Sequence, residues 1–307
     1  MSADLKPAID EGPALARVFS GHESFPCRFG WLPKLYQAVL EDPHLFSDDH
    51  KSILHLGLGR NMIKSIRFWG SAFGVTEYDS KQMRPTQFGR RLLDPKSGHD
   101  PYLEKLGSLW RLHWQISAHG GLGAWTTLFL DYKDSQITRS HLIERVQAQA
   151  LTIRGSITDR TAGNHVDMLI QTYDDRSPQK ANSLDVIACP LQELRLLRTY
   201  SLNGELMIEI NRGAKPSLST SDLAFALLNY ATQISPGSAI VSLRSLLLGR
   251  RGLGVIFRLD ESSLFIAAEK LAEEAGLSLQ ADGVGGINFV INEKSRALLD
   301  DFAWASS

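Results

Sequence analysis

The sequence predicts a mainly α-helical α+β protein that carries small β-hairpins in tandem winged-helix or helix-turn-helix-like modules. Three observations lead to this fold class. A helix-turn-helix pattern over residues 47–73 precedes a hairpin signal at 75–85. Asn203-Gly204 marks a second hairpin, because this pair suits a type I′ turn. A third hairpin, rich in glycine, is expected over 277–291 after a further run of helices.

Four segments are expected along the 307 residues. Residues 1–18 predict a flexible tail, and residues 19–134 an N-terminal helix-turn-helix domain. Residues 135–215 predict a middle winged-helix-like module, and residues 216–307 a C-terminal helical module of similar plan. Beyond the first domain, helices are expected at 138–151, 158–173, 219–232, 238–248, 260–275 and from 292 onward.

Composition restricts the class of protein. Hydrophobic residues make up 43% and charged residues 22% of the chain, as in an ordinary folded protein. The formal net charge is −1, which excludes a protein that is basic over its whole surface. No apolar run approaches the roughly 20 residues of a membrane span. The start of the chain lacks the apolar core of a signal peptide, and there are only two cysteines, so we expect a cytoplasmic protein.

The helix expected at about 61–73 has two opposite faces. Its apolar stripe comprises Met62, Ile66, Trp69 and Phe73. Its polar stripe, displaced by two residues, comprises Arg60, Lys64, Arg67 and Ser71. Two residues turn a helix by about 200°, so the basic stripe lies opposite the apolar one. A turn followed by such a helix is typical of DNA-binding helix-turn-helix proteins.

Basic charge is concentrated around this helix. Residues 51–96 contain nine Lys or Arg and three Asp or Glu, a net charge of +6. We therefore expect DNA contacts here, with Asn61 suited to an adenine edge. The candidate DNA-binding residues are Arg60, Asn61, Lys64, Arg67, Ser71, Lys81, Arg84, Arg90 and Arg91, with Arg250 and Arg251 from a second basic cluster. The alternative is that both clusters are plain solvated surfaces.

Three long motifs carry a family resemblance. They are FSGHESFP (19–26) with RFGWL (28–32), GLGRNMIKSIRFW (57–69), and DPYLE (100–104) with LWRLHW (109–114). CPLQEL (189–194) and FRLDE (257–261) are later echoes. Over about residues 19–302 the chain resembles the bacterial family known as domain of unknown function 4007 (DUF4007). It departs from the family at Cys27, where an aliphatic residue is usual, and at HGGLG (119–123).

The resemblance implies a role in DNA phosphorothioation, an anti-phage defence in which sulfur replaces a non-bridging phosphate oxygen. It implies as partners DNA, a cysteine desulfurase, an ATP-pyrophosphatase-like (PAPS-reductase-like) enzyme and an ATPase. A second copy of the chain is a further candidate partner. In single-strand modification systems the family member is the DNA-nicking component, so the resemblance also implies a nicking endonuclease. A nick would open the backbone where sulfur is installed.

The first motif supplies our leading catalytic candidates, which are His22, Glu23 and Arg28. In a loop, His22 could act as a base, Glu23 could hold a divalent cation, and Arg28 could neutralise developing charge. The alternative is structural: Glu23 would cap the following segment, and His22 would satisfy a buried backbone group.

Further catalytic candidates are Asp100, Glu104 and His113. The two carboxylates are four residues apart and would share one face of a helix. Glu23, Asp100 and Glu104 are therefore candidate ligands for Mg²⁺ or Mn²⁺, since these ions prefer oxygen ligands. The alternative is that Asp100 is a helix N-cap and Glu104 a first-turn acid.

Standard nuclease signatures are mostly missing, since no Glu-x-Lys or His-x-His pattern occurs. Asn164-His165 lacks the context of a His-Asn nuclease site and is expected on a helix surface. Three tryptophans, Trp110, Trp114 and Trp125, are expected in the core. The competing function is therefore a non-catalytic winged-helix protein that supplies DNA specificity or regulates transcription, and a pure assembly scaffold is a third possibility.

Overall fold

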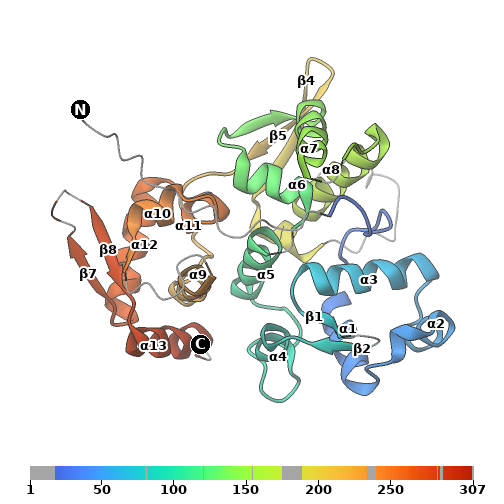
Figure 1. The fold of residues 1–307 in the computed structure, drawn as a ribbon, viewed down its shortest axis with the longest axis horizontal. Coiled ribbons are helices and arrows are strands. Elements are labelled where there is room, and N and C mark those ends of the chain that lie inside the picture. The colour runs from blue at the N-terminus through green and yellow to red at the C-terminus, as the bar shows by residue number, and fades with distance from the viewer. Residues whose placement is uncertain are drawn as a thin grey trace. The chain divides into compact units, whose positions relative to one another are not determined.

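The computed structural model describes residues 18–79, 82–119, 121–153, 155–174, 189–233, 240–281, 283 and 286–305. These residues form an α-rich α+β fold with small antiparallel sheets, as the sequence predicts. The chain divides into two compact units (Figure 1). The larger comprises Ala16–Arg212 with Pro216–Leu218, and the smaller comprises Ser219–Ala305 with Gly213–Lys215. Residues 1–17 of the expected tail and Lys81 lie outside the described residues.

The larger unit begins with helices around a two-stranded hairpin. In order, these elements are α1 (Trp31–Glu41), the 3-10 helix η1 (Leu45–Ser47), α2 (Asp49–Leu56), α3 (Arg60–Ala72), β1 (Thr76–Asp79), β2 (Gln82–Pro85) and α4 (Gln87–Leu93). Gly57 ends α2 with φ 62 and allows the tight turn into α3. Strands β1 and β2 pair in antiparallel fashion. The expected order of helix, turn, helix and hairpin is therefore present.

The rest of the larger unit contains a three-stranded sheet. Its elements are α5 (Leu106–Ala118), α6 (Gly123–Trp125), the π-helix η2 (Thr126–Asp131), β3 (Gln136–Thr138), α7 (Arg139–Ile153), α8 (Asp159–Tyr173), the 3-10 helix η4 (Pro190–Leu194), β4 (Leu197–Leu202) and β5 (Glu205–Ile210). The strand order is β3-β5-β4. Asn203 and Gly204 have φ 52 and 82, which confirms the expected hairpin turn.

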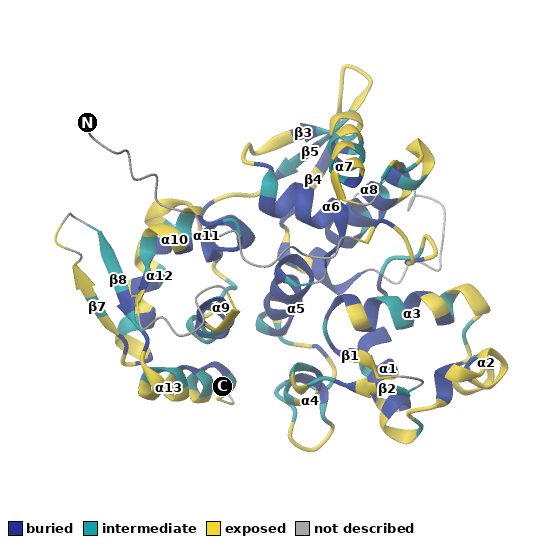
Figure 2. Ribbon diagram, in the orientation of Figure 1, coloured by how far each residue is buried: buried dark blue, intermediate teal, exposed yellow. Residues whose placement is uncertain are grey.

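The core of the larger unit is built on α5. Every residue of this helix from Ser108 to Ala118 is buried, and Figure 2 shows α5 and α6 almost entirely in dark blue. The expectation that Trp110, Trp114 and Trp125 belong to the core is confirmed, since each is at most 1% exposed. Trp125 also meets Trp69 of α3 edge-on, with ring centroids 5.9 Å apart. Aromatic packing therefore joins α3 to the centre of the unit.

The smaller unit repeats the plan of helices and a three-stranded sheet. Its elements are α9 (Thr220–Gln233), β6 (Ile240–Ser242), α10 (Leu243–Leu248), α11 (Leu253–Ile256), α12 (Glu261–Glu274), β7 (Ser278–Ala281), β8 (Ile287–Val290) and α13 (Glu293–Trp304). The strand order is β6-β8-β7. The helix expected from 238 to 248 is partly wrong, because Ile240 and Val241 pair with β8 as a strand. Within the described stretches, no helix combines the length and apolarity needed to cross a bilayer.

Candidate nucleic-acid interface

Helix α3 presents one charged face to solvent. Its exposed residues are Arg60, Asn61, Lys64 and Ser71. The opposite side includes Ile63, Ile66 and Trp69, each at most 1% exposed. The helix contains three basic residues and no acidic one. The basic stripe that the sequence predicts therefore lies at the surface, backed by buried apolar side chains.

Arg67 on the same helix is held between two aromatic rings. Its guanidinium carbon lies 5.1 Å from the ring centroid of Tyr78 on β1 and 5.8 Å from that of Phe46 in η1. A cation above the face of an aromatic ring is attracted by the negative π surface. Arg67 is accordingly only partly exposed, and its charge is fixed where the hairpin meets α3.

The remaining candidates of the first basic region differ in their environment. Arg84 on β2 forms an ion pair with Asp79 on β1 at 2.9 Å, so its charge is largely compensated. Arg90 is exposed and Arg91 is partly exposed in the last turn of α4. Cations there complement the negative end of the helix dipole. Lys64 and Arg60 are thus the candidates whose charge faces solvent with no acid on their own helix.

The first sequence motif fixes α3 from its buried side. The carbonyl oxygen of Phe25 accepts hydrogen bonds from Trp69 Nε1 at 2.8 Å and from Ser65 Oγ at 3.2 Å. Gly21, with φ 113, lies so close to Phe68 that a Cβ would come within 2.9 Å of its ring. The loop therefore needs glycine there and acts as a clamp along one side of the helix.

His22 in this loop packs against a second histidine. Its ring stacks on His165 of α8, with centroids 5.4 Å apart and planes 12° apart. His22 Nδ1 accepts a hydrogen bond from the backbone N–H of Ser24 at 3.2 Å, so the proton of the neutral ring sits on Nε2. Nε2 faces Nδ1 of His165 at 3.3 Å and donates to it. Burial lowers the pKa of His22 to about 4, and burial together with His22 lowers the pKa of His165 to about 3.

This arrangement corrects two expectations. His165 is fully buried rather than on a helix surface. His22 is only 4% exposed and its Nε2 already faces His165, so it is not placed to act on a DNA phosphodiester from solvent. Glu23 is exposed with φ 49, and Arg28 lies over the rings of Phe25 and Trp31 at 5.8 and 5.6 Å. The three residues of the first motif therefore do not converge as a single catalytic group.

The second catalytic set is also dispersed. The segment from Asp100 to Glu104 is not helical, since α5 begins at Leu106, so the expected shared helix face is wrong. Asp100 is buried and accepts backbone N–H groups of Glu104 and Lys105 at 3.0 and 2.9 Å. Its carboxylate shapes the loop, whereas Glu104 is exposed.

His113 lies in the aromatic core of α5. It is fully buried, and its Nδ1 is 2.7 Å from the hydroxyl oxygen of Tyr173 on α8. Tyr173 also accepts a hydrogen bond from Trp125 Nε1 at 3.2 Å. Burial raises the pKa of Tyr173 well above its ordinary value. Like His22, His113 ties α8 to its neighbours and does not face solvent.

Metal ligands are not gathered in the described part of the chain. No group of three His, Cys, Asp or Glu side chains among those residues could hold a metal ion. Glu23, Asp100 and Glu104 are therefore not brought together as the sequence suggests. These three residues alone therefore do not supply the set of oxygen ligands that Mg²⁺ or Mn²⁺ needs.

The second basic cluster is not an open basic surface. Arg251 is only 5% exposed, and Arg250 is partly exposed at the end of α10. A guanidinium buried to this extent does not face solvent, where a phosphate would have to meet it. The expectation that Arg251 contacts DNA is therefore corrected, and Arg250 keeps only a partial surface.

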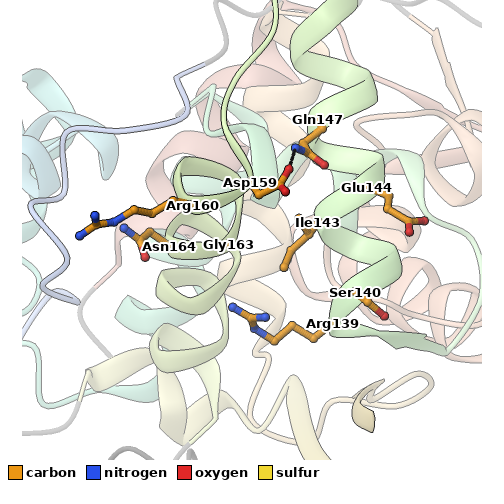
Figure 3. A pocket seen from close by; sticks show the side chains of 9 residues that line it. All are labelled: Arg139, Ser140, Ile143, Glu144, Gln147, Asp159, Arg160, Gly163 and Asn164. Carbon is orange, nitrogen blue, oxygen red and sulfur yellow. Dashed lines mark hydrogen bonds between the residues drawn. The ribbon is translucent and has the colours of Figure 1, made fainter.

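A polar groove of about 640 Å³ lies between α7 and α8 (Figure 3). Arg139 forms two hydrogen bonds to the carboxylate of Asp167, at 2.7 and 2.8 Å. Gln147 donates to Asp159 at 2.6 Å. Figure 3 shows Arg160 and Glu144 pointing away from each other. The charged groups that line the groove are thus paired or divergent and do not form a convergent site.

Sequence reasoning missed the residues that hold the site together. His165, Tyr173 and Phe46 lie far along the chain from their partners, so no local spacing indicates their contacts. One feature of the sequence did indicate a structural role for His22. It lies in a long motif, residues 19–32, and not in a short catalytic one. A clamp needs many consecutive residues, whereas a catalytic loop needs few.

The fold and site define an α+β protein whose exposed basic helix is held by a clamp of aromatic and histidine side chains. A family model described as "Protein of unknown function (DUF4007)" matches residues 19–302. The chain therefore belongs to the DUF4007 family.

Solved structures give a second comparison. An SspB crystal structure is 29% identical, with a TM-score of 0.81, covering 96% of this chain and 88% of that one. A magnesium ion-bound SspB crystal structure is 28% identical, also with a TM-score of 0.81, covering 96% of this chain and 89% of that one. No curated protein matches the chain.

The buried histidine pair predicts acid sensitivity. Both pKa values are lower in the folded protein than the ordinary 6.5, so the unfolded chain binds more protons below that pH. The free energy of unfolding is then lost as the pH falls from about 6.5 toward 4. At pH 5 the loss is about 2 kcal/mol for each histidine, since one pKa unit corresponds to about 1.4 kcal/mol.

Replacing His165→Gln keeps an acceptor for His22 and removes one titrating group. Urea unfolding followed by tryptophan fluorescence should show a smaller loss of stability between pH 7 and pH 5 than in the wild type. His141→Gln, at an exposed position of α7, is the matched control and should leave the pH dependence unchanged. An unaltered pH dependence in His165→Gln would contradict the assignment.

Proposed function

We propose that the protein binds DNA through α3 and the β1–β2 hairpin, as a component of a DNA phosphorothioation system. The observation that carries the proposal is the face of α3, which is exposed, basic and free of acids. Such a face attracts the phosphate backbone, and Asn61 at its start can contact a base edge. Arg67, fixed by Tyr78 and Phe46, is positioned at the junction of helix and hairpin.

The topology supports a winged-helix interpretation of all three modules. In each, helices precede a β-hairpin: α2 and α3 come before β1–β2, and α7 and α8, followed by the 3-10 helix η4, come before β4–β5. In the third module α10, the short α11 and α12 come before β7–β8. In the second and third modules, the strand before the helices pairs with the last strand, giving the orders β3-β5-β4 and β6-β8-β7. A winged helix combines these features, with its second helix in the DNA groove.

Of the three corresponding helices, all of them described, α3 of the first module is the one suited to DNA. The corresponding helix of the second module, α8, buries nine of its fifteen residues, among them His165 and Tyr173. A helix that is packed on several sides cannot enter a major groove. The corresponding helix of the third module, α12, is rich in glutamate. We therefore assign DNA binding to the N-terminal module.

Phosphorothioation is supported by family membership and by the match to SspB over 96% of the chain. On this proposal the protein works with DNA and with sulfur-transfer partners, namely a cysteine desulfurase, an ATP-pyrophosphatase-like enzyme and an ATPase. DNA binding by α3 would give those partners access to a chosen stretch of backbone.

DNA nicking is a second candidate function, and the magnesium ion-bound SspB structure favours it. His22, Asp100 and His113 are buried. The remaining catalytic candidates are Glu23 and Glu104, which are exposed, and Arg28, which is partly exposed. On this view a metal ion would be held partly by the DNA phosphate, because no described cluster of side chains supplies a full ligand set.

The double substitution Arg60→Ala with Lys64→Ala should weaken binding to a 20-base-pair duplex by about tenfold or more at 100 mM salt. The slope of log affinity against log salt should also fall by about 2, because each lost phosphate contact contributes about 0.9. Fluorescence anisotropy across a salt series measures both. Arg198→Ala, at an exposed arginine paired with Glu209, is the control and should bind as the wild type. Equal affinity and slope in the double variant would refute the assignment to α3.

Nicking is tested separately with supercoiled plasmid and Mg²⁺ or Mn²⁺. The second candidate predicts open circles that EDTA prevents. Glu23→Gln should then slow their appearance about 100-fold without weakening DNA binding, whereas Glu104→Gln is the comparison at the other exposed acid. If DNA is bound but stays supercoiled, with partner proteins as well as without them, the nicking candidate is abandoned and DNA binding stands.

A further inference from the structure

The three helices that occupy equivalent positions have very different charges. Helix α3 carries three basic residues and no acid, whereas α8 carries two acids and one arginine. Helix α12 carries four glutamates and one lysine, a net charge of −3. A DNA phosphate backbone would repel α12 in the position where a winged helix normally meets DNA. This helix is therefore available for a different partner.

The exposed face of α12 combines acids with apolar side chains. Phe265 is 39% and Ile266 is 53% exposed. Each residue advances about 100° around a helix, so Phe265, Glu269, Glu273 and Ile266 lie within an arc of about 100°. We call these four residues the α12 face. No ion pair between described residues involves its glutamates.

Single exposed apolar side chains are normal at a protein surface, but apolar side chains that are grouped and rimmed by polar groups mark interaction sites. Phe265 and Ile266 are adjacent and lie beside two glutamates. The two glutamates lie between Phe265 and Ile266 on the arc, so a complementary surface needs basic groups with apolar contacts close by. The chain itself carries such a surface. On α3, Arg60 and Lys64 are exposed. Arg67 of the same helix lies over the ring of Tyr78, which is 44% exposed.

We propose that the α12 face docks on the α3 surface of a second copy of this chain. The contact joins two different surfaces, so the α12 face of one copy meets α3 of another copy. Because the same α3 residues bind DNA in the proposed function, DNA and the second copy exclude each other. Self-association is thus a DNA-free state that holds the basic helix covered until DNA displaces the partner.

The contact is electrostatic at its centre, so it responds to salt. Analytical ultracentrifugation of the full chain should show reversible association at about 50 mM salt and at least a tenfold weaker association at about 300 mM. Adding a 20-base-pair duplex should return the protein to monomers bound to DNA. Phe265→Ala with Ile266→Ala should weaken association at least tenfold, while Leu298→Ala, at an exposed leucine of α13, should not.

A charge exchange tests the pairing directly. One variant carries Glu269→Lys with Glu273→Lys, and another carries Arg60→Glu with Lys64→Glu. Each alone should be monomeric, because like charges then face each other. Their equimolar mixture should associate again, because the basic α12 face of the first variant then meets the acidic α3 surface of the second. Circular dichroism and tryptophan fluorescence check that each variant is folded.

Three outcomes would overturn the proposal: a wild type that stays monomeric at low salt up to about 100 μM, association that survives Glu269→Lys with Glu273→Lys, or a mixture that does not associate. A monomeric wild type overturns it even if α12 is found to bind another protein. These measurements contain no DNA, so their failure is separate from failure of the proposed function. Conversely, if association holds but Arg60→Ala with Lys64→Ala leaves DNA binding intact, only the assignment of DNA to α3 fails.

Discussion

The carbonyl group of Phe25 is the point on which the basic helix depends. It accepts hydrogen bonds from Trp69 and Ser65, one turn apart on α3, and so fixes both the rotation and the depth of the helix. Breaking these bonds is costly, because the Trp69 and Ser65 side chains are buried and would be left without a partner. With the apolar side fixed in this way, the charged side can only face solvent. Function at the surface therefore follows from a constraint in the interior.

The histidine stack extends this constraint to α8. His22 lies in the same loop as Phe25. Its ring packs edge-to-face with the ring of Phe68 on α3 and stacks on the ring of His165. Trp125 touches both Trp69 and His165, so α3, α6 and α8 share one aromatic cluster. Such a cluster stays neutral near pH 7, because burial lowers the pKa of both histidines far below that value. His22, which resembles a catalytic group in the sequence, thus belongs to the buried support of α3.

The sequence predicted the features that depend on local pattern. Stripes spaced three and four residues apart defined α3 and its two faces, and Asn203-Gly204 located a turn that needs positive φ. What the sequence could not show was pairing between distant residues. Asp100 looked like a helix cap, yet its carboxylate closes a loop before α5 begins. His165 looked like a surface residue, because its partner lies 143 residues away. The basic run also suggested that Arg251 lies at the surface, but its side chain is buried.

Modules with a similar order of helices and strands need not have the same function. Of these three described helices, α8 is largely buried, α12 carries four glutamates, and α3 presents an exposed basic face. Division of labour among similar folds is expected, because function depends on the groups a fold presents and not on the fold itself. On the proposed function, this chain meets DNA through the exposed face of α3.

Chemical footprinting of lysines tests that connection most directly. The protein is treated with an amine-reactive reagent with and without saturating duplex DNA, and modification is measured by mass spectrometry. The account predicts that, at a protein concentration too low for self-association, DNA protects Lys64 on α3 several-fold and leaves the exposed Lys294 on α13 unchanged. Equal modification of Lys64 in the free and DNA-bound protein would contradict it.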